Sequence, residues 1–89
     1  GKAVYRCEVV LGSGFNHIEL SIGTNDVARV LVNGNEAGVR PWEPYRFDIT
    51  GICRQGSNMI EIEITSPYGN LFGQPVPSGL LEPPVLSVR

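Results

Sequence analysis

Hydrophobic and polar residues alternate along most of this chain. The clearest run is residues 59–65, where three isoleucines alternate with two glutamates. Successive side chains of a β-strand point to opposite faces, so this period of two predicts a strand with one face in a core and the other toward solvent. The same alternation predicts strands in four further segments, at residues 3–11, 18–22, 28–32 and 45–49.

Turn signals separate the alternating segments. The strongest is Asn33-Gly34, because a type I′ turn needs positive φ at both central positions and these residue types tolerate it best. It predicts a hairpin whose second strand is the short segment 37–40. Further on, Thr50 is predicted to cap one helical turn over residues 51–54.

The remaining segments complete the pattern. Residues 66–79 hold three Pro and three Gly, which predicts an irregular loop, and residues 80–89 are predicted to be extended. About seven short strands joined by turns predict an all-β chain, an antiparallel β-sandwich of the jelly-roll type. The first strand is predicted to direct four residues into the core: Tyr5, Cys7, Val9 and Leu11.

Composition and charge exclude several classes of protein. The 89 residues make one domain with a net charge of −2 and seven scattered basic residues, which argues against nucleic-acid binding. No apolar run approaches about 20 residues, so no membrane span is expected. The chain begins with Gly1-Lys2, without Met or a signal peptide, which suggests an excised or processed piece of a longer protein. Cys7 and Cys53 fit neither a zinc site nor a disulfide framework; free thiols are favoured and a bridge stays open.

Candidate catalytic chemistry is sparse. Glu61 and Glu63 lie two residues apart on one strand face, with Cα atoms about 6.5–7 Å apart, near the separation of an inverting glycosidase pair. They also alternate with isoleucines like any solvated strand face, and a catalytic acid needs burial to raise its pKa. His17 is the only histidine and has no partner at metal-ligand spacing. We therefore expect no catalytic residue, no metal site and no cofactor.

Several short sequence motifs follow one another in the order found in one group of domains. The motifs are Ala3-Val4-Tyr5-Arg6, Ala28-x-Val30-x-Val32-Asn33-Gly34 with Gly38 beyond it, Pro44-Tyr45-x-Phe47-Asp48-Ile49-Thr50, Gly56-x-Asn58 and Ser78-Gly79-Leu80-Leu81-x-Pro83. By these motifs the chain resembles the galactose-binding-like β-sandwich of glycoside hydrolases. It is similar to the sugar-binding domain of family 2 β-galactosidases and β-glucuronidases and to the corresponding domain of bacterial α-L-rhamnosidases.

The resemblance implies a non-catalytic accessory domain of a bacterial glycosidase, of the α-L-rhamnosidase or β-galactosidase/β-glucuronidase type. Such a domain scaffolds its parent enzyme, so its partners would be the parent's other domains, and it can border an oligo- or polysaccharide. Family 2 domains carry a longer N-terminal lead-in, and its absence here favours a C-terminal accessory domain. The resemblance also implies a periplasmic or secreted parent. Calcium occurs in such sandwiches, but Asn25-Asp26 offers too few oxygens to predict a site.

A second hypothesis is an autonomous carbohydrate-binding module. A sugar site needs an aromatic face for the C–H side of a ring and a few fixed polar groups for its hydroxyls. A single platform of this kind would bind weakly, with a Kd around 1 mM. The alternative is that the tryptophan packs over the sandwich mouth or against a neighbouring domain. The candidate sugar-contacting residues are Trp42, Tyr45, Arg40, Glu43 and Asn33.

A third hypothesis assigns residues 66–79 to protein interaction. Tyr68, Leu71 and Phe72 lie there among Gly and Pro, in a loop long enough to be functional. An exposed apolar patch of this kind would mark a docking surface. The alternative is that the loop folds over one open end of the sandwich and buries the three side chains.

Overall fold

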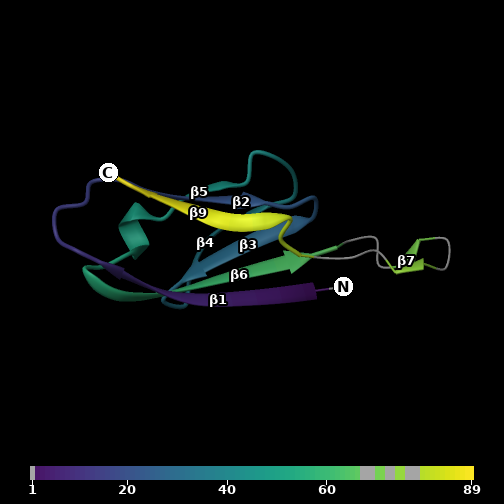
Figure 1. Ribbon diagram of the computed structural model, residues 1–89, viewed down its shortest axis with the longest axis horizontal. Coiled ribbons are helices and arrows are strands. Elements are labelled where there is room, and N and C mark those ends of the chain that lie inside the picture. The colour runs from purple at the N-terminus through teal and green to yellow at the C-terminus, as the bar shows by residue number, and fades with distance from the viewer. Residues whose placement is uncertain (1, 67–69, 72–73, 76–78) are drawn as a thin grey trace.

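The computed structural model describes residues 2–66, 70–71, 74–75 and 79–89, and the side chains of residues 2–66 and 79–89. The described chain is almost entirely β-strand, with one short 3-10 turn (Figure 1). No helix in this part of the chain is long and apolar enough to cross a membrane. In order, the elements are β1 (Lys2–Leu11), β2 (Ile18–Gly23), β3 (Val27–Val32), β4 (Asn35–Arg40), β5 (Arg46–Asp48), η1 (Thr50–Ile52), β6 (Gly56–Thr65), β7 (Asn70–Leu71), β8 (Gln74–Pro75) and β9 (Glu82–Val88).

Seven of these strands form two antiparallel sheets. The larger sheet has the order β1-β6-β3-β4, and the smaller has the order β5-β2-β9. β7 and β8 pair only with each other, away from the two sheets (Figure 1). Two sheets packed face to face confirm the predicted all-β antiparallel sandwich. The prediction that residues 66–79 contain no strand is wrong at β7 and β8.

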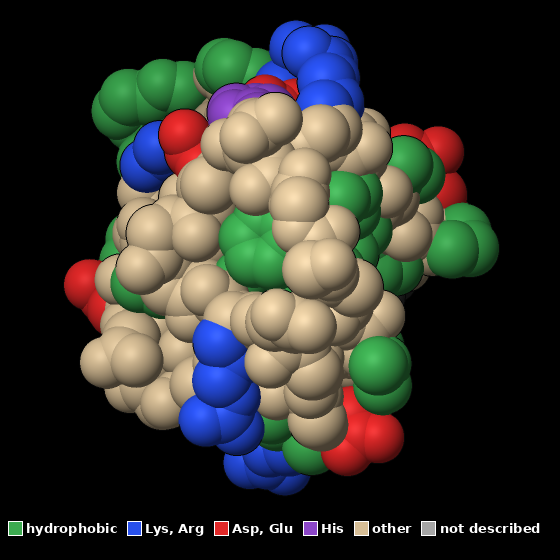
Figure 2. Space-filling view, turned by 90° about the vertical axis from the view of Figure 1, so that its left-hand side faces the viewer, with side chains coloured by type: hydrophobic (Ala, Val, Ile, Leu, Met, Phe, Trp, Pro, Cys, Tyr) green, Lys and Arg blue, Asp and Glu red, His purple; other side chains and the backbone are tan. Residues whose placement is uncertain are grey.

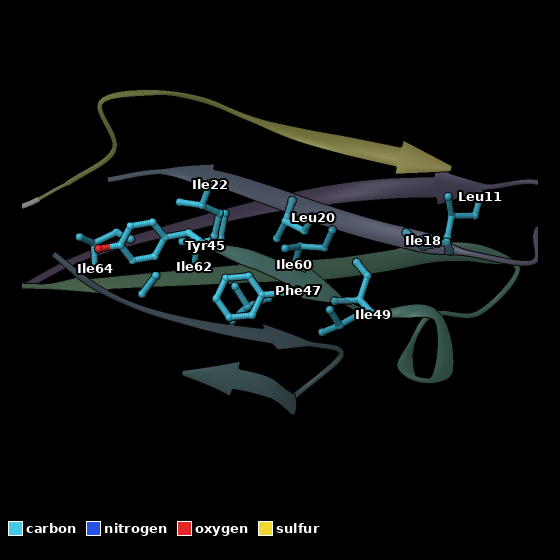
Figure 3. Packing of buried hydrophobic residues seen from close by; sticks show 13 residues of the cluster. Leu11, Ile18, Leu20, Ile22, Tyr45, Phe47, Ile49, Ile60, Ile62 and Ile64 are labelled. Atoms are coloured by element: carbon cyan, nitrogen blue, oxygen red, sulfur yellow. The ribbon is translucent and has the colours of Figure 1, made fainter. Parts of the chain in front are cut away.

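The core lies between the two sheets and follows the predicted alternation. β6 contributes Ile60, Ile62 and Ile64, each at most 2% exposed, and its neighbour β3 and strand β2 of the other sheet contribute every second residue as well. These side chains interdigitate in a single layer (Figure 3). The full cluster is Leu11, Ile18, Leu20, Ile22, Ala28, Val30, Val32, Tyr45, Phe47, Ile49, Ile60, Ile62 and Ile64.

The first strand departs from its predicted burial. Tyr5 and Cys7 have the inward phase, because they pair with Ile62 and Ile60 of β6, yet both are exposed. The physical reason is the unequal width of the sheets: four strands face three, and β1 is the end strand of the wider sheet. Only Leu11 of β1 is fully buried, so the prediction of an inward core row is wrong for Tyr5 and Cys7.

The hairpin at Asn33-Gly34 forms as predicted. Asn33 has φ of 53° and Gly34 has φ of 84°, the positive values that a type I′ turn requires. The returning strand β4 begins at Asn35, two residues before the predicted start. Its register on β3 shifts between Val30 and Leu31, which marks a bulge.

Thr50 does not cap η1, contrary to prediction. It is the first residue of η1, and no side chain caps this turn. Instead, the Thr50 backbone N–H and hydroxyl both donate to Asp48 Oδ1, at 3.0 and 2.6 Å. The Thr50 hydroxyl oxygen accepts from the Ile18 backbone N–H at 2.9 Å, so this side chain ties η1 to β2.

Candidate functional site

The connection between β4 and β5 presents the most exposed aromatic side chain of the described residues. Trp42 is 73% exposed, and it lies between Pro41 and Pro44 in this connection. The Glu43–Pro44 peptide bond is cis. At this exposure the Trp42 ring is not packed over the sandwich mouth by the described residues. Its ring is free to meet a sugar or a neighbouring domain.

An open pocket of about 420 Å³ lies beside this connection. Three of the residues that line it have polar or charged side chains: Ser21, Glu43 and Arg46. A concave site with a few convergent polar groups is the usual form of a small-ligand site. The lining residues are Ser21, Ile22, Glu43, Pro44, Tyr45 and Arg46.

Ser21 and Arg46 did not figure among the residues expected from the sequence. They face each other across the β2–β5 pair, 25 positions apart in the sequence, and no local motif links them. The sequence could have shown one thing about them. Each alternates with buried neighbours along its strand, so each side chain points away from the core. Strand pairing, which brings them together, was not part of the sequence pattern.

Tyr45 belongs to the core, although it was a candidate for sugar contact. Its side chain is 5% exposed and points in among the core residues (Figure 3). Burial raises the pKa of its hydroxyl above the ordinary value, and the nearby Glu43 carboxylate adds to the rise. The faces of the ring are therefore closed to a stacking ligand.

Arg40 supports the sandwich edge beside the site. Its guanidinium carbon lies 5.3 Å from the centroid of the Phe47 ring, and its Nη1 donates to the Val39 carbonyl at 3.2 Å. The cation over the ring face links β4 of one sheet to β5 of the other. The guanidinium is exposed, so it combines this contact with access to solvent.

Asn33 lies at the opposite end of β3 from Arg40. Ala28, at the start of β3, pairs with Arg40, while Asn33 follows its last residue, a distance of about 17 Å along the strand. The five residues proposed from the sequence thus do not form one site. Trp42, Glu43 and Arg40 lie at one end, Tyr45 lies in the core beside them, and Asn33 lies at the other end.

The Asn33 side chain holds the far end together. Its Oδ1 accepts from the Met59 backbone N–H at 3.0 Å, and its Nδ2 donates to Asn58 Oδ1 at 3.0 Å. Asn58, 1% exposed, also accepts from the Arg54 N–H and donates to the Arg54 and Gly56 carbonyls. Figure 2 shows this end of the molecule, where a hydrophobic area is surrounded by backbone and polar atoms. The two asparagines are structural.

The glutamates of β6 are paired with cations on the outer face of the larger sheet. Glu61 accepts from Arg6 Nε at 2.7 Å, and Glu63 lies 3.0 Å from Lys2 Nζ and 3.4 Å from Arg29 Nη1. The hydrogen bond from Lys2 is the main reason why the pKa of Glu63 lies below its ordinary value. A general acid needs the opposite shift. These pairs support the structural interpretation of both carboxylates.

A second acidic pair, absent from the sequence hypotheses, lies on the outer face of the smaller sheet. Glu19 and Asp48 are opposite each other on β2 and β5, and the His17 ring nitrogens are 3.9 Å from each carboxylate. Hydrogen bonds from Thr50 lower the pKa of Asp48. The described residues contain no group of three or more side chains arranged to hold a metal ion.

The residues of the third hypothesis fall largely outside the described part of the chain. Tyr68 and Phe72 lie outside the described residues. Leu71 is in β7, but the described side chains do not include it. Docking through residues 66–79 stays a prediction.

Cys7 and Cys53 are both free thiols.

Comparison with known proteins finds similarity to glycoside hydrolases. No family model matches the chain. A curated protein of Formosa agariphila, named "Putative beta-glucuronidase", is 34% identical over 56 residues, which are 62% of this chain and 5% of that protein. A rhamnosidase structure from Novosphingobium sp. PP1Y matches 74% of this chain and 7% of its own, with 31% identity and a TM-score of 0.68.

A more distant structure supports the fold over the whole chain. A β-glycosidase from Bacteroides vulgatus matches 99% of this chain and 12% of its own, with 24% identity and a TM-score of 0.74. The chain therefore spans only a small fraction of each protein that it matches. It is similar to one part of much longer glycosidases.

Proposed function

We propose that this chain is a non-catalytic accessory domain of a bacterial glycoside hydrolase, of the α-L-rhamnosidase or β-galactosidase/β-glucuronidase type. The observation that carries the proposal is the coverage: the chain matches 5% of one glycosidase sequence and 7% of one rhamnosidase structure, at 34% and 31% identity. A β-sandwich of 89 residues is also far smaller than the roughly 250 residues of a typical catalytic barrel.

The side-chain geometry supports a scaffolding role. The carboxylates closest to a catalytic pair, Glu61 and Glu63, are bound to cations of neighbouring strands. The sequence motifs shared with such domains build turns and core: Asn33 and Asn58 hold two turns, and Asp48 with Thr50 anchors η1. The partners of the domain would be the other domains of a periplasmic or secreted parent.

Two measurements test the accessory role. The 89-residue chain is assayed with nitrophenyl α-L-rhamnoside, β-D-galactoside and β-D-glucuronide, and no turnover above the buffer rate is expected. The gene is also sequenced on both sides of the codons for this chain, where a catalytic glycosidase domain is expected. Turnover by the isolated chain would contradict the non-catalytic role, and a gene that encodes no glycosidase domain would contradict the parent.

A second function, carbohydrate binding, is favoured by one specific observation. Trp42 is 73% exposed beside a pocket that carries Ser21, Glu43 and Arg46. An exposed indole can cover the apolar face of a sugar ring while these groups bond to its hydroxyls. We expect weak binding, with a Kd of about 1 mM, because one platform is offered.

The binding function is tested with a glycan array and titration of its hits. Trp42→Ala should abolish binding, and Arg46→Ala should weaken it. Leu81→Ala is the matched control, because Leu81 is also exposed (67%) but does not line the pocket. Folded wild-type chain that binds no plant, bacterial or host glycan would reject this function and leave the accessory role standing.

A further inference from the structure

The outer edge of β1 is open to another strand. β1 is an end strand of the larger sheet, and its second edge has no partner strand in the described part of the chain. It is 10 residues long and contains neither Pro nor Gly. Val4, Tyr5 and Val10 are 42%, 38% and 73% exposed. A long edge strand without Pro or Gly is a template for pairing with a strand of another chain.

We propose that a second copy of this chain pairs antiparallel with β1, with Cys7 of the two copies on a two-fold axis. Arg6 of each copy then faces Glu8 of the other, so two opposite charge pairs close the interface. The larger sheets of both copies join into one continuous sheet. The apolar contacts in this register are Tyr5 with Val9, Val4 with Val10 and Ala3 with Leu11.

The register follows from the sequence of the edge. A continuous sheet needs the inward rows of both copies on the same side, so each residue must face one of the same inward or outward phase. Centring the pair on Arg6 or on Glu8 would put like charges on the axis, which is destabilising. Centring it on Tyr5 would overlap residues 2–8 alone and set Arg6 against Val4. Centring it on Cys7 overlaps residues 3–11 and leaves no charge opposite an apolar residue.

The groups that would meet are accessible. The Arg6 side chain is 66% exposed and uses its Nε for Glu61, which leaves its two terminal nitrogens for a second carboxylate. Glu8 is exposed and accepts one bond from the Ser57 hydroxyl, at 2.9 Å. The Cys7 side chain, which is exposed, would gain neighbours on the inward side beside Tyr5, whose hydroxyl accepts from the Leu80 backbone N–H at 3.3 Å. β9, the corresponding strand of the smaller sheet, is less suited because Pro83 and Pro84 lack N–H groups.

Cys7 supplies a direct report on the register. Facing residues of antiparallel strands have Cα atoms about 4.5–5.5 Å apart, within the range that a disulfide spans. The 89-residue chain is treated with diamide, which takes two protons and two electrons from two thiols. We expect a disulfide-linked dimer in the wild type and in Cys53→Ser, and none in Cys7→Ser. A cross-link that forms through Cys53 would overturn the proposed interface.

Charge-reversal variants test the strand pairing without a covalent cross-link. Sedimentation equilibrium should show a monomer–dimer equilibrium, and Glu8→Arg should weaken it by about tenfold, because two attractive pairs become repulsive. The double variant Arg6→Glu with Glu8→Arg should restore the dimer, and Glu43→Arg, a reversal on the far loop, should leave it unchanged. A chain that stays monomeric up to millimolar concentration would overturn the proposal and assign the edge to a strand of a different chain. A dimer insensitive to Glu8→Arg would overturn it too.

Discussion

Two asparagines illustrate how single residues determine this structure. Asn58 is almost fully buried, and its side chain satisfies every donor and acceptor that it carries, against Asn33 and the backbone of the loop after η1. A buried amide of this kind stabilises the fold only while all its partners remain in place. The sequence placed both asparagines in shared motifs but assigned Asn33 to sugar contact. The bond between the two side-chain amides joins residues 25 positions apart, so no local pattern could predict it.

Replacement of Asn58 by Ala should therefore be strongly destabilising. The change would leave the Arg54 N–H and the Asn33 amide, both partly buried, without their acceptor, at up to about 1–3 kcal/mol each. We expect a loss of about 2–4 kcal/mol in the free energy of unfolding, measured by urea titration. Asn25→Ala, at an exposed position, is the control and should change stability by less than about 0.5 kcal/mol. Equal stabilities of the two variants would contradict the role of Asn58.

Acid should weaken the outer face of the larger sheet. Lys2 and Arg29 lower the folded-state pKa of Glu63 below its ordinary value of 4.5. A group with a lowered folded pKa contributes its stability above the unfolded pKa and loses it as pH falls through the folded value. The urea midpoint of the wild type should thus fall as pH drops below about 4.5, and Glu63→Gln should flatten this slope. An unchanged slope in the variant would show that other carboxylates govern it.

At the scale of elements, the alternation of hydrophobic and polar residues predicted where the strands lie, but not how deeply each is buried or which strands pair. Residues 59–65 alternate clearly, and the structure extends that strand to Gly56–Thr65 as β6. Alternation gives the phase of a strand, but its burial depends on whether another strand lies opposite. β1 has the same alternation as β6 and remains exposed because the facing sheet ends before it. The pocket depends on strand pairing in the same way, which is why Ser21 and Arg46 were not predicted.

The hairpin between β3 and β4 offers a test of turn geometry. At Gly34 the φ of 84° is unfavourable for other residues, while a Cβ there would meet nothing within 4 Å. Gly34→Ala should therefore cost about 1–2 kcal/mol through the backbone alone. Gly12→Ala is the matched control, because its Cβ would also meet nothing and its φ is not in the positive region. Gly12→Ala should be neutral or slightly stabilising. The free energy of unfolding of both variants is measured by urea titration, and equal values would contradict the role of the Gly34 backbone conformation.

At the scale of the whole molecule, one layer of side chains between two unequal sheets provides the stability. The described part of the chain contributes 13 buried hydrophobic residues to this layer. A domain of this size has a small margin of stability, so each core side chain accounts for a considerable part of it. The edge at β1, the loop around Trp42 and the end with Asn33 lie around this layer and depend on it for their position.

Removal of one central side chain should therefore lower the melting temperature markedly. Ile62, 2% exposed, lies in the middle of β6, and Ile62→Ala should cost about 2–5 kcal/mol by leaving a cavity. For a domain of this length that corresponds to a fall in Tm of at least about 8 °C. Met59→Ala, at a 45% exposed position of the same strand, should shift Tm by a few degrees at most. Calorimetry that gives the same shift for both would contradict this account of the core.

The ion pairs on the larger sheet have a consequence for how its surface can change. Glu63 bridges Lys2 and Arg29, Arg29 also binds Glu36 at 2.7 Å, and Arg6 binds Glu61, so opposite charges alternate across all four strands. A substitution at Glu63 would leave Lys2 and Arg29, on the two sides of β6, without their shared carboxylate, and a simultaneous change at Lys2 would remove one of these unpaired cations. Effects of paired changes on this face should thus be non-additive. The effect of a change at Glu63 is therefore expected to depend on which residues stand at Lys2 of β1 and Arg29 of β3.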